Sequence, residues 1–228
     1  MDLARNHPDA EQRRKHQSRV DLLIPVVKGW CTEVGQELSS VGVQVHGGMG
    51  FMEETGAAQH MRDARIITIY EGTTGIQAAD LTGRKLAMDG GKAMGELVVE
   101  MEQEQQQLAD SDDSELNGLA DALGEGVKAL QSATAQQLAL LKEDPNAALT
   151  EAVNYMMLSG YVYGGWQMAK AARLAKDRLA AGDNSGFYQA KVITARFYAE
   201  QIMPKAGALA QAIASRGSTV MALAEEQF

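Results

Sequence analysis

Long stretches without proline constrain the fold of this chain more than any other feature. Only 4 prolines occur among its 228 residues, and the segments between them are rich in alanine, leucine, glutamine and glutamate. These residues lose little side-chain freedom in a helix, whereas proline removes a backbone donor and clashes with the preceding turn. Because 45% of the residues are hydrophobic, the chain can also bury a substantial core. We therefore expect an all-α protein of one or two domains.

The acidic charge is unevenly distributed along the chain. Of the formal net charge of -9, residues 1–92 account for -1 with 11 basic and 12 acidic side chains, and residues 93–228 for -8 with 10 and 18. This asymmetry predicts a domain boundary between residues 92 and 93. Nucleic-acid binding needs clustered Lys and Arg, so we expect no nucleic-acid partner.

The single cysteine, Cys31, leaves no partner for an internal disulfide and cannot build a zinc site without several nearby histidines or carboxylates. We expect no metal site, and we expect Cys31 and its neighbour Trp30 to be packing residues. The polar residues 1–11 do not resemble a signal peptide, and no run approaches the roughly 20 apolar residues of a membrane span. These features predict a soluble, cytoplasmic protein.

Apolar residues recur every three or four positions from Val20 to Val45, which predicts one face of a long helix. Pro25 is expected to kink this helix or to lie in its first turn. Glycines at 47, 48 and 50 then predict a tight turn, where backbone N–H groups could approach a phosphate or a cofactor. No Lys-Ser/Thr pair follows them, so the pattern is neither a P-loop nor a Rossmann turn.

The next segment places a carboxylate just before a helix. A short helix is expected from about Glu53 to Arg65, and the β-branched run 66–69 is expected to be extended. The spacing of Thr74 and Gln77 predicts a capping box at the start of another helix, directly after Glu71. The helix dipole there favours a charged carboxyl, while burial against an apolar ligand favours a neutral one. Glu71 is therefore either an ordinary acid at a helix start or a proton-abstracting base.

Beyond the break at residues 89–91, four helical stretches are expected to form an antiparallel bundle. The breaks between them are predicted at residues 110–114, 143–145, 182–186 and 216–218. Residues 100–115 contain seven acids and no base, which predicts a solvated helix face and loop.

Three sequence blocks resemble the acyl-CoA dehydrogenase family. They are VQVHGGMGF at 43–51, MRDAR at 61–65 and IYEGTTGIQ at 69–77, in the family's order and spacing. Residues 93–228 are similar to the helical extension of larger members, a group that includes the methylthiopropanoyl-CoA dehydrogenases. The resemblance implies an incomplete C-terminal helical domain in residues 1–92, followed by a second antiparallel bundle. It also implies an amino-terminally truncated product, a split gene, or a subunit that needs a complement.

The resemblance implies a role for six residues. Glu71 matches the catalytic base, and Gly72 would lie beside the acyl thioester. Gln44, Gly47 and Gly48 match the stretch that contacts the adenosine diphosphate part of FAD, often the FAD of a neighbouring subunit. Thr73 matches a residue that touches FAD.

The activity implied is the oxidation of acyl-CoA to trans-2-enoyl-CoA, with α-proton abstraction by Glu71 and β-hydride transfer to FAD. The implied partners are the acyl-CoA substrate, an electron-transfer flavoprotein and further copies of the chain in a homo-oligomer. Two alternatives remain open at this point. The chain could be a noncatalytic helical assembly module, or a fragment inactive alone, and it could be an acyl-CoA oxidase that passes electrons to oxygen.

Overall fold

The computed structural model describes residues 1–183, 185–217, 219–220 and 222–227, and all regular structure within them is helical. The predicted all-α fold is confirmed. The longer helices are α2 (Ala10–Val45), α4 (Ala57–Ile66), α6 (Lys92–Ala109), α7 (Ser114–Glu143), α9 (Ala152–Ala180), α10 (Gly186–Phe197) and α11 (Pro204–Ala214). The shorter elements are α1 (Asp2–Asn6), α3 (Gly48–Phe51), η1 (Glu53–Thr55), α5 (Thr74–Asp80), η2 (Leu81–Leu86), α8 (Pro145–Thr150), η3 (Tyr198–Ile202) and η4 (Glu225–Gln227). No helix in these ranges is both long and apolar enough to cross a membrane.

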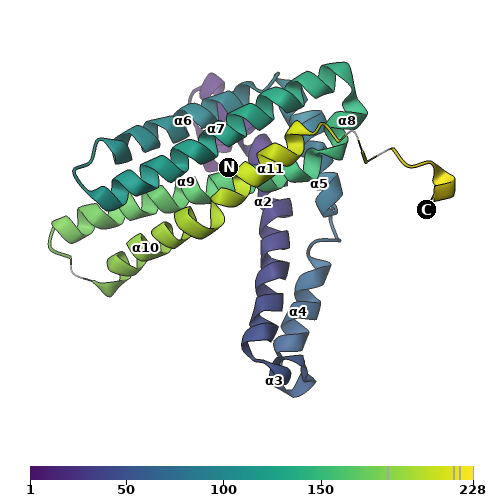
Figure 1. Cartoon of the computed structure of the whole chain (residues 1–228). Helices are drawn as coiled ribbons and strands as arrows, with labels where there is room; N and C mark the ends of the chain where they lie inside the picture. The colour runs from purple at the N-terminus through teal and green to yellow at the C-terminus, as the bar shows by residue number, and fades with distance from the viewer. Residues whose placement is uncertain (184, 218, 221, 228) are drawn as a thin grey trace.

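The bundle of the second half is antiparallel, as predicted. Helices α6, α7, α9 and α10 lie side by side, and α11 packs across α7 and α9 (Figure 1). The predicted breaks at 110–114, 143–145 and 182–186 coincide with the ends of helices, and the last of them includes residue 184, which is not described. The break predicted at 216–218 follows α11, although Ser218 lies outside the described residues.

The acid-rich segment 100–115 is less solvated than its composition predicts. Glu104 is buried, 6% exposed, and binds Arg173 of α9 with 2.6 Å between Oε1 and Nε. Hydrogen bonds from Lys176, also on α9, lower the pKa of both Asp113 and Glu115. The prediction of a solvated face is therefore wrong at Glu104, because basic residues of α9 face the acids from more than sixty positions away along the chain.

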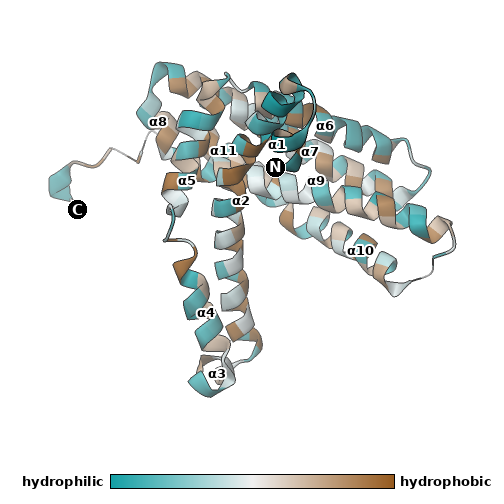
Figure 2. Cartoon of the chain, turned by 180° about the vertical axis from the view of Figure 1, so that it is seen from behind, coloured by the Kyte–Doolittle hydropathy of each residue, from teal (hydrophilic) through white to brown (hydrophobic). Residues whose placement is uncertain are grey.

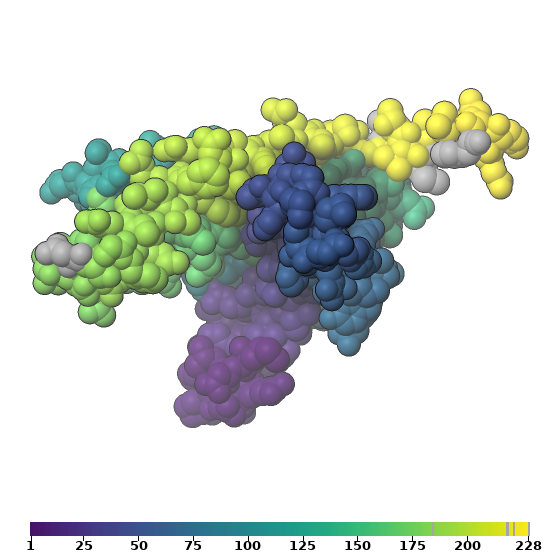
Figure 3. All heavy atoms as spheres, turned by 90° about the horizontal axis from the view of Figure 1, so that it is seen from below, coloured from purple at the N-terminus to yellow at the C-terminus, as the bar shows by residue number. Residues whose placement is uncertain are grey.

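Helix α2 belongs to two parts of the molecule. Its first half packs against α6 and α9, while residues 34–66 leave the bundle as an arm made of the end of α2, α3 and α4 (Figures 1 and 2). Pro25 lies buried in the interior of α2, which excludes the first-turn position, one of the two alternatives expected for it. The glycine turn is confirmed, since Gly47 has φ 60° at the tip of the arm. Figure 3 looks from below onto this tip, whose blue atoms stand in front of the bundle.

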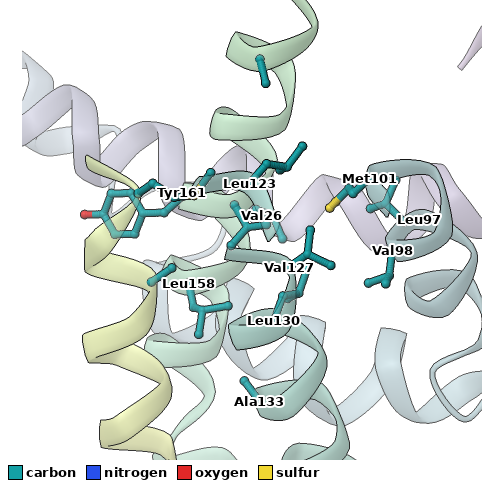
Figure 4. Close-up of a cluster of buried hydrophobic side chains, with 14 of the residues drawn as sticks. Val26, Leu97, Val98, Met101, Leu123, Val127, Leu130, Ala133, Leu158 and Tyr161 are labelled. Carbon is teal, nitrogen blue, oxygen red and sulfur yellow. The ribbon is translucent and has the colours of Figure 1, made fainter. Parts of the chain in front are cut away.

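One cluster of buried apolar side chains joins the first half of α2 to the bundle. It includes Val26 of α2, Leu97 of α6, Val127 of α7, and Leu158 and Tyr161 of α9 (Figure 4). Side chains from both sides of residue 92 contribute to this cluster. The domain boundary expected at that residue stays a prediction.

Glycines on α9 let α2 approach closely. A Cβ on Gly160 would overlap the indole ring of Trp30, and the ring of Tyr161 packs edge-on against the same indole with 5.8 Å between centroids. The packing role predicted for Trp30 is thus confirmed. Cys31 is exposed, so its predicted packing role is wrong in this chain. The next residue on a helix points about 100° away, which turns the thiol from the contact that buries its neighbour.

We expect Gly160→Ala to lower the free energy of unfolding by about 1–3 kcal/mol, because the added methyl group overpacks the contact with Trp30. Gly118→Ala is the matched control, since Gly118 is helical and exposed with no heavy atom within 4 Å of its Cβ position. The control is expected to stabilise by about 0.5–1 kcal/mol. Urea unfolding followed by circular dichroism measures both, and equal effects would contradict the close approach.

Candidate active site

The loop of residues 67–73 joins α4 to α5 where the arm meets the bundle (Figure 1). The N–H groups of Ile69 and Tyr70 both donate to the carbonyl of Ile66, at 3.0 and 3.2 Å. These bonds wind the chain into a turn, so the predicted extended run at residues 66–69 is wrong. The β-branched residues do favour extended backbone, but that preference is weak and tertiary context overrides it.

Glu71 and Gly72 both have left-handed backbone, with φ of 53° and 97°. In the part of the chain that the structure describes, only Arg216 is another non-glycine residue with positive φ. An ordinary side chain in this region costs about 1–2 kcal/mol. Such strain persists only where the surroundings hold the backbone, and it concentrates at functional sites.

Helix α2 holds the loop at both ends. Lys28 donates through Nζ to the carbonyl of Ile67, and Nζ also lies 5.4 Å from the ring centroid of Tyr70. At the other end, the hydroxyl of Thr74 donates to Oε1 of Glu33. These contacts lie on either side of Glu71, so α2 fixes the positions of both ends of the loop that contains the strained residue.

The cap of α5 differs from the predicted one by one residue. The N-cap is Thr73, whose Oγ1 accepts from the N–H of Ile76 at 3.3 Å. The predicted capping box of Thr74 and Gln77 is wrong, because the Thr74 hydroxyl is used by Glu33, which no local pattern reveals. The predicted helix start itself, directly after Glu71 and Gly72, is confirmed.

Gln77 covers the strained pair instead. Its Nε2 lies 3.5 Å from the carbonyl oxygen of Glu71, at the outer limit of a hydrogen bond. A Cβ on Gly72 would lie 2.5 Å from the same nitrogen. Glycine is therefore needed at 72 for its positive φ and for the space that Gln77 occupies.

The remaining predicted site residues lie elsewhere, at the tip of the arm. Gln44, Gly47 and Gly48 are exposed there, and neither glycine has a heavy atom within 4 Å of its Cβ position. Eleven residues of α2 separate Gln44 from Glu33, about 16 Å at the helical rise. The structure thus brings Glu71, Gly72 and Thr73 together, and Gln44, Gly47 and Gly48 together, but keeps the two groups apart.

Other residues of the arm have structural partners. Arg62 binds Glu53 with two contacts, 3.0 Å to Oε1 and 3.2 Å to Oε2. Nδ1 of His46 lies 2.8 Å from the carbonyl oxygen of Gly42. Across the described ranges, no group of three or more His, Cys, Asp or Glu side chains is arranged to hold a metal ion.

Sequence reasoning missed Lys28, Glu33 and Gln77. Lys28 and Glu33 contact the loop across 39 and 41 residues of chain, and on α2 they read as ordinary charged positions. Gln77 lies inside a recognised block, yet its contact with Glu71 depends on the left-handed turn between them.

Comparison with known families agrees with this helical arrangement. The model of the family described as "Acetyl-CoA dehydrogenase C-terminal like" matches residues 97–224, and the model described as "Acyl-CoA dehydrogenase, C-terminal domain" matches residues 6–86. The chain therefore belongs to the acyl-CoA dehydrogenase family, in which it corresponds to the C-terminal helical part.

The chain is also similar to individual proteins of known name. A 3-methylmercaptopropionyl-CoA dehydrogenase of Ruegeria pomeroyi is 41% identical over 97% of this chain and 37% of its own length. A broad-specificity linear acyl-CoA dehydrogenase of Mycobacterium tuberculosis is 31% identical over 91% of this chain and 35% of its own length. A shorter match, 36% identical over 27% of this chain and 16% of its own length, is subunit CarC of a caffeyl-CoA reductase-Etf complex of Acetobacterium woodii. The chain spans little more than a third of the two longer matches.

We expect Glu71→Gly to raise the free energy of unfolding by up to about 1 kcal/mol, because glycine relieves the left-handed strain at the cost of a more flexible unfolded chain. Glu71→Gln is the control, since it removes the charge and keeps the strain. Urea unfolding of the two variants and the parent chain provides the measurement. A glutamine variant stabilised as much as the glycine variant would point to the charge, and not to the backbone.

Proposed function

We propose that this chain supplies the catalytic base and part of the flavin site of an enzyme that oxidises acyl-CoA to trans-2-enoyl-CoA. The observation that carries the proposal is the backbone of Glu71, held at positive φ by contacts from α2 at both ends of its loop. Backbone strain concentrates at functional sites, so strain at a carboxylate before a helix start supports a role beyond capping. The YEGT block at residues 70–73, whose resemblance to the family implies a base at Glu71, supports the same assignment.

In the proposed reaction, the Glu71 carboxylate takes the proton from the carbon next to the thioester carbonyl. The backbone N–H of Glu71 would donate to the thioester oxygen as negative charge develops there. FAD, when bound, would supply the redox chemistry by accepting the β-hydrogen together with its electron pair. The products would be the enoyl-CoA, a protonated Glu71 and reduced FAD, so protons and electrons balance.

We assign Gly72 to a backbone contact with the acyl thioester, because the amide of Gln77 occupies the side-chain position at this glycine. The Glu71 side chain is exposed in this chain, whereas proton abstraction requires that water be excluded. In the proposed enzyme, the flavin, the acyl chain and the regions of the relatives that this chain does not span would cover it.

The residues assigned to FAD fit a bound dinucleotide. The backbone at Gly47 and Gly48 is open to close approach, and Gln44 presents an exposed amide next to it. Thr73 accepts a hydrogen bond from Ile76 through Oγ1, which leaves its own hydroxyl hydrogen available to donate. We assign Gln44, Gly47 and Gly48 to the adenosine diphosphate part of FAD, and Thr73 to a contact near the reacting end.

We propose an electron-transfer flavoprotein as the electron acceptor, supported by the Etf complex named for the Acetobacterium woodii relative. The names of the two longer relatives support a short thioether-containing or straight-chain acyl-CoA as substrate. The cytoplasm, predicted from the sequence, is the compartment we propose for this reaction.

We expect Glu71→Gln to slow flavin bleaching by acyl-CoA about 10²- to 10⁴-fold, since it removes a general base. The assay uses a chimera in which this chain replaces the matching region of the Ruegeria pomeroyi relative, with 3-methylmercaptopropionyl-CoA and butyryl-CoA as substrates. Glu54→Gln, at another exposed glutamate, on the arm, is the control and should bleach at the parent rate.

The same assay separates the alternatives. Undiminished bleaching in the Glu71→Gln chimera would show that Glu71 is not the base. Peroxide formed in proportion to substrate would identify an oxidase. A chimera that folds but remains colourless would favour the noncatalytic assembly module.

We also propose that copies of the chain associate through the arm. Val45 and Phe51 are 79% and 80% exposed, and Leu38 and Val41 are also exposed on the same arm. Exposed apolar surface of this kind favours association.

Analytical ultracentrifugation of the chain should show a dimer or larger species, and Phe51→Ser should weaken this association. Leu174→Ser, at an exposed position of α9, is the control. A monomer at high concentration would rule out this interface.

A further inference from the structure

Three helices meet at one buried glycine of α2. A Cβ on Gly29 would lie 2.5 Å from Cε of Met156, on α9, and 3.5 Å from Cβ of Gln77, on α5. Met156 is fully buried. The side chains of Met156 and Gln77 therefore both lie against the same short stretch of α2 backbone.

Gln77 extends from this junction to the strained residues. Its side-chain amide lies against Gly72 and the Glu71 carbonyl, and its own backbone N–H donates to the carbonyl of Thr73 at 2.9 Å. Next to it, Ala78 is completely buried in the core shared with α9. Gln77 thus lies against the core at its Cβ and against the Glu71 loop at its amide.

Helices α2 and α9 are tightly packed at this junction. Gly160, one helical turn beyond Met156, receives the indole of Trp30, so α9 contacts α2 without an intervening void at two successive turns. Close-packed interiors transmit a displacement because the atoms have no free space to absorb it. A shift of α9 would therefore move Gln77 and the left-handed turn together.

We infer that α9 positions the catalytic base, with Met156 and Gln77 as the positioning residues. The inference rests on the proposed function of Glu71 and gives the helical extension a role in that function. Residues 97–224 and 6–86 match two different family models, and the junction at Gly29 joins Met156 of the first range to Gln77 of the second. In this inference, α9 of the helical extension supports the Glu71 loop through the core and does not touch substrate.

The first test replaces Gln77 by methionine, which keeps the length of the side chain and removes its amide. Hydrogen exchange of the chain, followed by mass spectrometry, should show exchange about two- to tenfold faster at residues 68–73, as expected for one lost weak hydrogen bond. Exchange in α6 and α7 should not change. Gln137→Met is the matched control, because Gln137 of α7 is completely buried and its amide has no hydrogen-bond partner among the described residues.

The second test acts from the α9 side. Met156→Ala removes the contact at Gly29 and should also accelerate exchange at residues 68–73, whereas Met156→Leu fills similar volume and should restore the parent rate. A folded Met156→Ala variant with unchanged loop exchange would overturn the inference. If that variant does not fold, the Gln77→Met result decides, and unchanged loop exchange there overturns the inference equally.

The kinetic readout separates this inference from the proposed function. In the chimera, Gln77→Met should lower kcat several-fold with a smaller change in KM, since Gln77 is assigned no direct contact with substrate and acts through the backbone of Glu71 and Gly72. A change in KM alone would contradict a positioning role. Hydrogen exchange requires no activity, so active Glu71→Gln chimeras would refute the base and leave the coupling intact. Loop exchange insensitive to both substitutions would refute the coupling even where Glu71→Gln abolishes bleaching.

Discussion

The contact of Trp30 with Gly160 fixes the position of α2, and α2 holds everything else at the candidate site. The indole occupies the space that a side chain at Gly160 would take, which anchors α2 to the core of the bundle. From that anchored segment, Lys28 and Glu33 reach the two ends of the Glu71 loop. The same helix then continues into the arm and carries Gln44 at its end. A loose α2 would leave all six assigned residues without a defined place.

The strain at Glu71 is understandable from this support. A left-handed glutamate costs about 1–2 kcal/mol, which a glycine would save. The contacts at Ile67 and Thr74 offset that cost, because they keep the loop short and its ends fixed. Proteins commonly retain such local costs where activity needs a particular orientation of one group. The backbone of Glu71 thus supports the proposed role of this residue independently of the motif around it.

The sequence predicted the parts of this structure that depend on local chemistry. Helix periodicity located α2, the glycines located the turn at the arm tip, and the helix start after Glu71 and Gly72 was placed correctly. The sequence misplaced the features decided by distant partners. The run at residues 66–69 became a turn, the cap moved from Thr74 to Thr73, and Glu104 became buried opposite Arg173. In each case a contact across the fold, or the continuation of a neighbouring helix, outweighed a preference of a few tenths of a kcal/mol to about 1 kcal/mol.

The group at residues 71–73 lies far from the group formed by Gln44, Gly47 and Gly48, and this distance determines whether substitutions in the two groups can influence each other. About 16 Å of α2 lies between Glu33 and Gln44, and groups separated by more than about 10 Å without shared partners usually act independently. Substitutions at Gly47 and at Gly72 should therefore have additive effects on the stability of this chain. Any departure from additivity in an active chimera must come from something that touches both groups, such as a bound dinucleotide or a second copy of the arm. A double-mutant cycle performed in both settings would thus measure how much of the site this chain forms by itself.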